Sequence, residues 1–423
     1  MNPGLVVKLR PNGPWRIGPD SGARNRVDTI YHSDSLYSAV TWAIARLGLL
    51  DSWLEATARA NRPAVSFSSC FPFLDEIGFV APPRTIWPPS SPALLSARVR
   101  WKSARFIPLG VVQAILMGHA LDENHWAVDG ASECLVPAGR IGPFRAGARW
   151  SAAVDRLTGA TERHSAACIE FHPGAGLWTV VSFADEAARS LWLEKVKAAF
   201  RLLADSGFGG ERSRGWGYAE APEFVEGALP DMILQSAGTS GGVIGQKPSN
   251  MIASAAVSEP AEARPNAEQA RNASPGAGAM AESEGLVEPS PAAEPPPPSE
   301  PAVPESSGGS ETSLPKTAST ALANEAGVSR MASYWLLSLF APAPADSVDW
   351  GRGNYSVIER GGRVESAAGS GHLKKQVRMI AEGSVLCASG VLRGAAPDVA
   401  PDGFAHPVFR AGFALAIPLP EAS

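Results

Sequence analysis

A glycine- and arginine-rich loop, residues 205–217, has the residue types best suited to bind a ligand. It contains five glycines together with Arg212, Arg214 and Trp216. Glycine lets the backbone approach a ligand closely and adopt positive φ, and successive exposed N–H groups form a concave anion site. Arginine suits phosphate through its forked donors, and tryptophan can stack on a base. The loop therefore predicts a phosphate contact, and a glycine-rich hairpin without a ligand is the alternative.

Two common nucleotide-binding motifs do not fit this loop. From Gly210 the spacing Gly-x-x-x-x-Gly resembles a P-loop, but a Trp-Gly pair stands where Lys and Ser/Thr are required. From Gly207 the pattern ends in Arg212, where the dinucleotide fingerprint has its third glycine. Both motifs lead from a strand into a helix, whereas this loop follows a predicted helix. Nucleoside triphosphates and dinucleotides are therefore not expected here.

The elements around the loop indicate an α+β fold. Apolar spacing predicts a helix over 35–47, with Ser33 or Asp34 as its cap. It also predicts a helix over 185–204, with Leu191, Val196, Phe200 and Leu203 roughly on one face. Strands are expected at 4–10, 167–172, 177–183 and 218–224. This order favours a β-α-β-β-α-β sandwich with two helices on one face of a sheet.

The rest of the chain divides into a linker and a second folded part. No aromatic residue occurs between Phe224 and Tyr334, and this stretch is rich in Ala, Pro, Ser, Glu and Gly. Such a sequence cannot bury enough apolar surface to fold, so disorder is expected over 235–330. Strands at 333–340, 384–391 and 408–417 predict a smaller β-rich domain. The expected organisation is 1–234, 235–330 and 331–423.

Charge is distributed unevenly along the 423 residues. The net charge is −5, but residues 251–329 hold eleven glutamates and three basic residues. The remaining 34 basic and 31 acidic residues give the rest of the chain a net charge of +3. A mildly basic folded part permits nucleic-acid binding without requiring it.

The cysteines argue against metal and disulfide chemistry. All four are far apart and form no Cys-x-x-Cys pair, which predicts reduced thiols in a cytoplasmic protein. His164, Cys168 and His172 are spaced four apart, but their neighbours favour a strand on which successive members would lie about 13 Å apart. We therefore expect no metal and no cofactor. Neither a secretory signal nor a membrane span is expected.

Three further groups of basic residues could contact RNA. Arg98, Arg100, Lys102 and Arg105 flank Trp101 at alternating spacing, which on a strand or hairpin would give one basic face. Arg156 lies in an Asp-Arg-Leu-Thr-Gly segment, where it could instead form a local ion pair with Asp155. Lys374 and Lys375 form a short basic run. A solvated charged surface is the alternative for the first and last groups.

Several segments together resemble a known family. They are His-Ser-Asp-Ser-Leu at 32–36, Asp-Arg-Leu-Thr-Gly at 155–159, the glycine loop, Gly-Gly-Arg-Val-Glu-Ser at 361–366, Glu-Gly-Ser at 382–384 and His-Pro-Val-Phe-Arg at 406–410. This combination resembles the RAMP superfamily of CRISPR-associated proteins. Within it, the chain is most similar to the family of the fourth Csm subunit of type III-A effector complexes, the Cas5-like member. The resemblance covers about 1–230 and 331–420, and the long acidic linker is a departure from it.

The resemblance implies a role in antiviral defence and two ferredoxin-like (RRM-like) domains. It implies a non-catalytic subunit that grips the 5′ repeat-derived handle of the guide RNA and docks onto the large polymerase-like subunit and the backbone RAMP subunits. Carried over by position, the phosphate contacts would come from Gly209, Gly210, Arg212, Ser213, Arg214 and Gly215, and Trp216 of the same loop would also bind the RNA. His32 and Ser33 would lie beside the RNA at the start of the first helix, with Arg156 near them.

Two other functions remain open at this point. Some RAMP relatives cut repeat RNA without a metal, using a histidine as general base, and here His32 with Arg212 or Arg214 could supply a base and a cation. No second histidine is expected beside His32, which argues against this reading. A free single-stranded RNA binder outside any complex is the third possibility. For His32 itself, a hydrogen bond within its own turn is the alternative to RNA contact.

Overall fold

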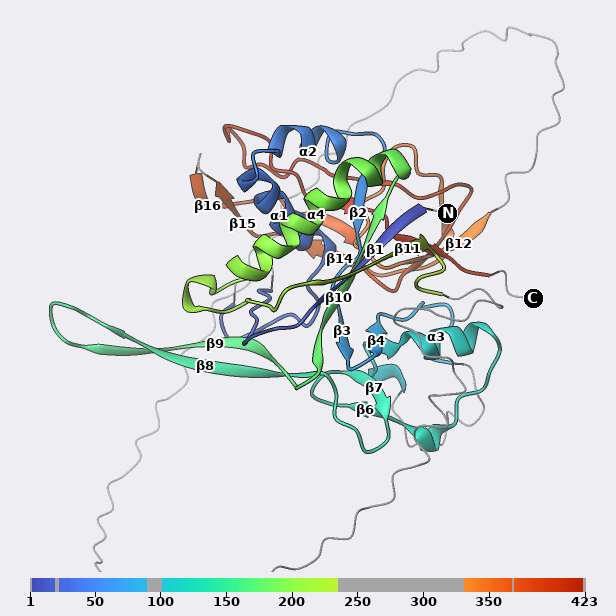
Figure 1. Cartoon of the computed structure of the whole chain (residues 1–423), viewed down its shortest axis with the longest axis horizontal. Coiled ribbons are helices and arrows are strands. Elements are labelled where there is room, and N and C mark those ends of the chain that lie inside the picture. Colours follow the sequence, from blue (N-terminus) through green and yellow to red (C-terminus); the bar gives the residue numbers. More distant parts are fainter. Residues whose placement is uncertain (1, 20–22, 90–100, 235–330, 367–368, 421–423) are drawn as a thin grey trace, which may run out of the picture. The chain divides into compact units, whose positions relative to one another are not determined.

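The computed structural model describes residues 2–19, 23–89, 101–234, 331–366 and 369–420. These residues belong to one compact unit, which takes in both the N-terminal and the C-terminal part of the chain. The fold is mixed, with several antiparallel sheets and few helices (Figure 1). The predicted linker, 235–330, and the candidate residues Arg98 and Arg100 lie outside the described residues.

An antiparallel sheet of seven strands forms the centre of the N-terminal part. Its order is β11-β1-β10-β3-β4-β5, and β2 also pairs with β10. The strands are β1 (Asn2–Leu9), β2 (Val65–Phe67), β3 (Phe71–Leu74), β4 (Ile77–Val80), β5 (Ile107–Pro108), β10 (Ala175–Phe183) and β11 (Glu223–Leu229). Strand β1 is buried along nearly its whole length because it lies between β10 and β11. The predicted strands at 4–10 and 177–183 are confirmed.

Within the described residues, four α-helices accompany this sheet: α1 (Ser33–Arg46), α2 (Leu50–Ala56), α3 (Leu109–Leu116) and α4 (Glu186–Ser206). Helices α1 and α4 pack against each other and against the sheet (Figure 1). No helix among the described residues is long and apolar enough to cross a membrane. The helices predicted over 35–47 and 185–204 correspond to α1 and α4, and both cover the central sheet.

The apolar face of α4 differs from the prediction at one position. Leu191 is 55% exposed, whereas Trp192 is buried together with Val196, Phe200 and Leu203. The large indole covers the core at the place that we assigned to the leucine. The N-cap is Asp185, whose carboxylate accepts a hydrogen bond of 2.9 Å from the amide of Ala188.

The cap predicted for α1 is wrong. The N-cap residue is His32, and no side chain caps the helix. Ser33 and Asp34 belong to the first turn, and both side chains are buried. They point toward partners elsewhere in the chain, as described below, so they are not available to cap their own helix.

A long hairpin of β8 (Phe144–Val154) and β9 (Thr161–Phe171) extends from the N-terminal part (Figure 1). Only the 167–172 end was predicted, because the outer arms carry mostly exposed residues without an apolar alternation. The Asp-Arg-Leu-Thr-Gly segment is its turn, in which Asp155 accepts hydrogen bonds from the amide of Leu157 and the hydroxyl of Thr158. Nearby are β6 (Trp126–Asp129) and β7 (Cys134–Pro137), which pair with each other.

The C-terminal part is built from strands, and its described residues contain no helix. A four-stranded sheet has the order β13-β18-β12-β21. Its strands are β12 (Ala332–Leu336), β13 (Val348–Asn354), β18 (Val385–Ala388) and β21 (Ala416–Pro418). Three two-stranded ribbons are β14 (Val357–Arg360) with β17 (Val377–Ile380), β15 (Arg363–Ser366) with β16 (Gly369–Leu373), and β19 (Gly394–Ala395) with β20 (Gly412–Phe413).

The predicted C-terminal strands are present but shorter. The strand expected over 333–340 ends at Leu336, and the one expected over 408–417 is divided between β20 and β21. Ser338 lies at this break. Its hydroxyl donates to the carbonyl of Phe413 at 2.9 Å and accepts from the amide of Leu415 at 2.8 Å. Hydrogen bonds of the Ser338 side chain thus replace part of the regular backbone hydrogen bonding between the strands.

The two parts share one hydrophobic core. Trp335, Leu337 and Phe413 from the C-terminal part belong to the same buried cluster as the strands and helices of the N-terminal part. The indole of Trp335 also donates to the carbonyl of Ala81 at 3.1 Å. Because the core is continuous, the N-terminal and C-terminal parts support each other's folding.

Candidate nucleic-acid interface

The start of α1 forms a buried ionic junction with the C-terminal part. The carboxylate of Asp34 accepts hydrogen bonds from Arg360 Nε at 3.1 Å and Nη2 at 3.0 Å, and it also binds Arg410. All three side chains are less than a tenth exposed. Burial alone would raise the pKa of Asp34, but the guanidinium groups of Arg360 and Arg410 outweigh it and hold the pKa well below its usual range.

His32 lies between two carboxylates. Its Nδ1 is 2.7 Å from Glu382 Oε1, and its Nε2 is 3.1 Å from Asp28 Oδ2. Burial alone would lower the pKa of His32, but the carboxylates of Glu382 and Asp28 raise it to about 9. The hydroxyl of Ser69 donates a further hydrogen bond to Glu382. At neutral pH the imidazole is therefore protonated, and both of its N–H groups have partners.

Ser33 connects the same elements through neutral hydrogen bonds. Its amide donates to Ser69 Oγ at 2.8 Å, and its hydroxyl accepts from the amide of Leu339 at 2.9 Å. Ser33 is buried, so its contact with RNA, which the resemblance implied, has no support in this position. The predicted helix start is thus the place where α1 joins the C-terminal strands.

A groove of about 880 Å³ opens beside this junction. Both parts of the chain line it. Its charged and aromatic lining residues are Asp28, His32, Arg84, Trp87, Lys102, Arg105, Glu133, Glu359, Arg360 and Glu382. The groove brings together three residues that the sequence analysis proposed separately, namely His32, Lys102 and Arg105. It also adds Arg84, which lies in a proline- and arginine-rich segment but was not among the candidates.

The backbone around Lys102 is not the strand that the alternating spacing predicted. Residues Trp101–Ser103 form a 3-10 turn, in which Trp101 is 3% exposed and Lys102 is exposed. Trp101 packs edge-on against Trp87 with ring centroids 5.6 Å apart, so it is a core residue rather than a stacking surface. Arg105 donates to Thr29 Oγ1 at 2.6 Å and to Asp28 Oδ1 at 3.3 Å.

The inner glycines of the loop are required by contacts within the chain. Gly209 has φ +72°, and a Cβ there would lie 2.4 Å from the carbonyl oxygen of Arg16. Gly217 has φ +82°, and a Cβ there would lie 2.0 Å from the carbonyl oxygen of Phe208. The amide of Gly210 donates to Arg16 O at 2.9 Å. The close approach that the sequence analysis expected toward a ligand is, for these glycines, an approach to neighbouring backbone.

The outer part of the loop faces solvent. Residues Arg212–Arg214 form a 3-10 turn that ends at Gly215, whose φ is +80° and whose missing Cβ has open space around it. Ser213, Arg214 and Gly215 are exposed, and Trp216 is half-buried. Arg214 pairs with Glu211 at 3.1 Å. The predicted phosphate contacts can therefore come from this outer turn and its arginines, not from the inner backbone.

Two predicted sites lie elsewhere. Arg156 is at the exposed turn of the β8–β9 hairpin, and its expected position near His32 stays a prediction. Lys374 is half-buried, and its amide donates to the carbonyl of Gly362. Lys375 is exposed and pairs with Asp402 at 2.7 Å. A solvated charged surface accounts for Lys375.

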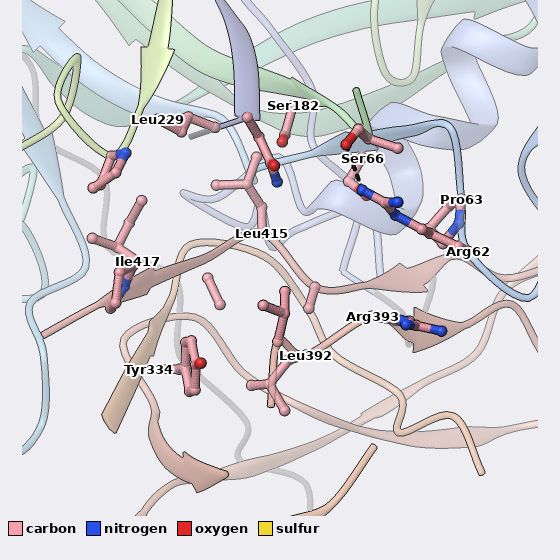
Figure 2. A pocket seen from close by; sticks show the side chains of 17 residues that line it. Arg62, Pro63, Ser66, Ser182, Leu229, Tyr334, Leu392, Arg393, Leu415 and Ile417 are labelled. Atoms are coloured by element: carbon pink, nitrogen blue, oxygen red, sulfur yellow. Dashed lines mark hydrogen bonds between the residues drawn. The ribbon is translucent and has the colours of Figure 1, made fainter. Parts of the chain in front are cut away.

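A second cavity of about 440 Å³ is mainly apolar. Figure 2 shows Tyr334, Leu392, Leu415 and Ile417 around it, with Arg62 and Arg393 among its lining residues. None of the predicted site residues lines it. Among the residues that the structure describes, no group of three His, Cys, Asp or Glu side chains is placed to hold a metal ion.

Comparison with known proteins points to one class. Residues 329–419 match the family model described as the CRISPR Csm4 C-terminal domain. This match confirms the resemblance to the fourth Csm subunit over the C-terminal part of the chain. No curated protein matches the chain.

Solved structures show a similar fold at low sequence identity. The crystal structure of a Csm3-Csm4 subcomplex from the type III-A CRISPR-Cas interference complex contains a chain with 13% identity and a TM-score of 0.50, over 98% of this chain and 99% of that one. A chain in the Csm1-Csm4 cassette in complex with cA4 has 13% identity and a TM-score of 0.47, over 100% and 99%. At this low identity, the similarity to the chain of the Csm3-Csm4 subcomplex shows only that the two chains share a fold.

Proposed function

We propose that this chain is a non-catalytic, cytoplasmic subunit of a type III CRISPR effector complex that grips the 5′ repeat-derived handle of the guide RNA in antiviral defence. The observation that carries the proposal is the match of residues 329–419 to the Csm4 C-terminal domain. The RNA-binding surface would consist of the groove beside His32 and the outer turn of the glycine loop. Both present arginine or lysine side chains to solvent.

The groove supports RNA binding through its exposed cations. Arg84 and Lys102 are both exposed at its edge, and Arg105 is partly exposed beside them. Three of the four lining carboxylates bind cations of the protein: Asp28 and Glu382 bind His32, and Glu359 binds Arg378, whereas Glu133 is exposed. Phosphate groups would thus meet the cations, and backbone contacts of this kind dominate affinity for nucleic acids.

The environment of His32 supports a non-catalytic role. A general base for attack by a 2′-hydroxyl must be an unprotonated imidazole within reach of that hydroxyl. His32 is buried, both ring nitrogens have carboxylate partners, and its pKa is raised to about 9. In this position His32 acts as a cation that joins Asp28 to Glu382. This argues against the endoribonuclease reading.

The partners would be the large polymerase-like subunit and the backbone RAMP subunits of the same complex. The solved complexes named above contain a Csm4 chain together with Csm1 or Csm3. We extend these partners to this chain on the basis of its family. We also infer a ferredoxin-like N-terminal unit, because β1, α1, β2, β10, α4 and β11 follow the β-α-β-β-α-β order with β1 and β10 at the centre.

The proposal is tested by replacing the groove cations. In the full chain, Arg84→Gln combined with Lys102→Gln should weaken binding of single-stranded RNA with the repeat-derived 5′ sequence by about tenfold or more at low salt. The salt slope should fall by about one for each phosphate that the variant no longer binds. Lys195→Gln is the matched control, because Lys195 lies over Trp192 on α4 and does not line the groove.

The readout is fluorescence anisotropy across a salt series, together with co-purification of guide RNA by the complex assembled from neighbouring genes. Parent-like affinity of the folded double variant at every salt concentration would remove the groove from the RNA-binding surface. Cleavage of repeat RNA by the purified chain alone, abolished in His32→Gln, would favour the endoribonuclease.

A further inference from the structure

Two arginines lie on one tryptophan where α1 faces the glycine loop. Trp42 is in α1, Arg46 follows it by one helical turn, and Arg212 begins the outer turn of the loop. The guanidinium carbons of Arg46 and Arg212 are 5.1 Å and 5.5 Å from the centroid of the Trp42 ring. Both distances are within the range of cation–π contacts. Arg46 is exposed, and Trp42 and Arg212 are half-buried.

The loop backbone fixes where Arg212 stands. Gly207 ends α4 with φ +89°, and Arg212 Cγ lies only 3.1 Å from the position of a Cβ on Gly207. The loop is then attached by the amide of Gly210 to Arg16 and by the amide of Gly217 to Pro14. Helix α1 places Trp42 and Arg46 one turn apart on the same face. Two rigid elements therefore bring the arginines to one indole.

This arrangement suits a phosphodiester. A guanidinium that lies on an aromatic face uses its own face, while its N–H donors remain in its plane and match phosphate oxygens. Single-stranded RNA backbone is the ligand class that fits, because the ring and the guanidiniums also offer stacking surfaces for bases.

We propose that Arg46 and Arg212 form a phosphate clamp for single-stranded RNA and that Trp42 is the residue that positions them. The inference rests on the proposed function and adds two residues to its binding surface, Trp42 and Arg46. Arg46 contacts the phosphate directly. Trp42 acts through the arginines, so an aromatic replacement at this position preserves the clamp and an aliphatic one does not.

The test uses the full chain and fluorescent single-stranded RNA with the repeat-derived 5′ sequence. Arg46→Gln should weaken binding by about tenfold at low salt, the scale of one hydrogen bond between charged groups. It should also lower the salt slope by about 0.7 to 1. Trp42→Leu should weaken binding and lower the slope to a similar extent, whereas Trp42→Phe should remain within about threefold of the parent. Lys195→Gln, about 18 Å along α4 from Gly207, should bind like the parent.

Each outcome has a distinct meaning. Parent-like affinity and slope for folded Arg46→Gln would overturn the clamp while leaving the groove and the proposed function standing. Weak binding by Trp42→Leu with an unchanged salt slope, or with no rescue by Trp42→Phe, would show a structural role and also overturn it. Unchanged RNA affinity with failed assembly of the complex would assign the surface to a protein partner instead. If the parent chain and its complex bind no RNA, the proposed function fails, and the clamp fails with it.

Discussion

At the scale of single residues, ion pairing decides the roles of the His-Ser-Asp segment. His32 and Asp34 carry opposite charges, and each finds its counter-charge on the C-terminal part: Glu382 for the histidine, Arg360 and Arg410 for the aspartate. Removing one member of such a buried group leaves an uncompensated charge without solvent. The segment therefore connects distant parts of the chain through buried ion pairs.

The pKa of His32 predicts a pH dependence of stability. Because the pKa is raised from 6.5 to about 9, the protonated form stabilises the folded state fully below pH 6.5, and this contribution disappears as pH rises through 9. The free energy of unfolding should therefore fall by up to about 3 kcal/mol over this window. Denaturant unfolding at pH 6.5, 8 and 9.5 measures it. A slope equally steep in His32→Gln would assign the effect to another group.

Asp34 should tolerate substitution poorly. Asp34→Asn removes the negative charge between two buried guanidinium groups, so we expect the free energy of unfolding to fall by about 3–5 kcal/mol. Asp402→Asn is the matched control, because its partner Lys375 is exposed and water can solvate the lysine in place of the carboxylate. Thermal unfolding of both variants is the measurement. Equal midpoints would mean that the Asp34 junction contributes nothing to stability.

At the scale of elements, the glycine loop combines two kinds of glycine. Gly209 and Gly217 have positive φ and backbone atoms in the way of any Cβ. Gly215 also has positive φ but open space where its Cβ would be. The first kind attaches the loop to residues 14–16 and to Phe208, and the second closes the exposed turn. Because the loop is attached on its inside, its outer turn faces solvent, where a ligand can approach.

This difference predicts unequal effects of alanine. Gly215→Ala should cost about 1 kcal/mol, the penalty of a left-handed backbone with a Cβ. Gly209→Ala should cost clearly more, because its Cβ would also collide with the carbonyl oxygen of Arg16 at 2.4 Å. Chemical denaturation compares the two variants directly. If Gly209→Ala were as stable as Gly215→Ala, the loop would have to lie farther from Arg16 than it does here.

At the scale of the whole molecule, the continuous core makes one structural unit from two stretches of sequence. Tyr37 of α1 packs edge-on against Phe413 of β20, with ring centroids 5.5 Å apart. The ionic junction and the groove lie between the same stretches. The groove therefore depends on correct association of the two parts. Non-covalent contacts between them, rather than the linker that joins them, hold the two walls of the groove in place.

We accordingly expect the two stretches to associate as separate chains. Co-expression of 1–234 with a tagged 331–423 should give a stable complex that co-purifies, because the buried cluster and the Asp34 junction span both. The same pair carrying Asp34→Asn should co-purify poorly. Recovery of the tagged chain without its partner would show that residues 235–330 contribute to association, beyond serving as a tether.

The sequence by itself determined the local features of this protein. Apolar spacing located α1 and α4, the composition separated the chain into parts, and the combination of short segments indicated the Csm4 family. What the sequence could not determine was the partner of each charged residue. Asp34 next to a helix start predicted a cap, and the basic residues around Trp101 predicted a face that could contact RNA, because local spacing carries no information about residues that are hundreds of positions away. The tertiary structure decided that Asp34 meets Arg360 and Arg410, and that Trp101 enters the core, because burial and long-range charge pairing outweigh local preference.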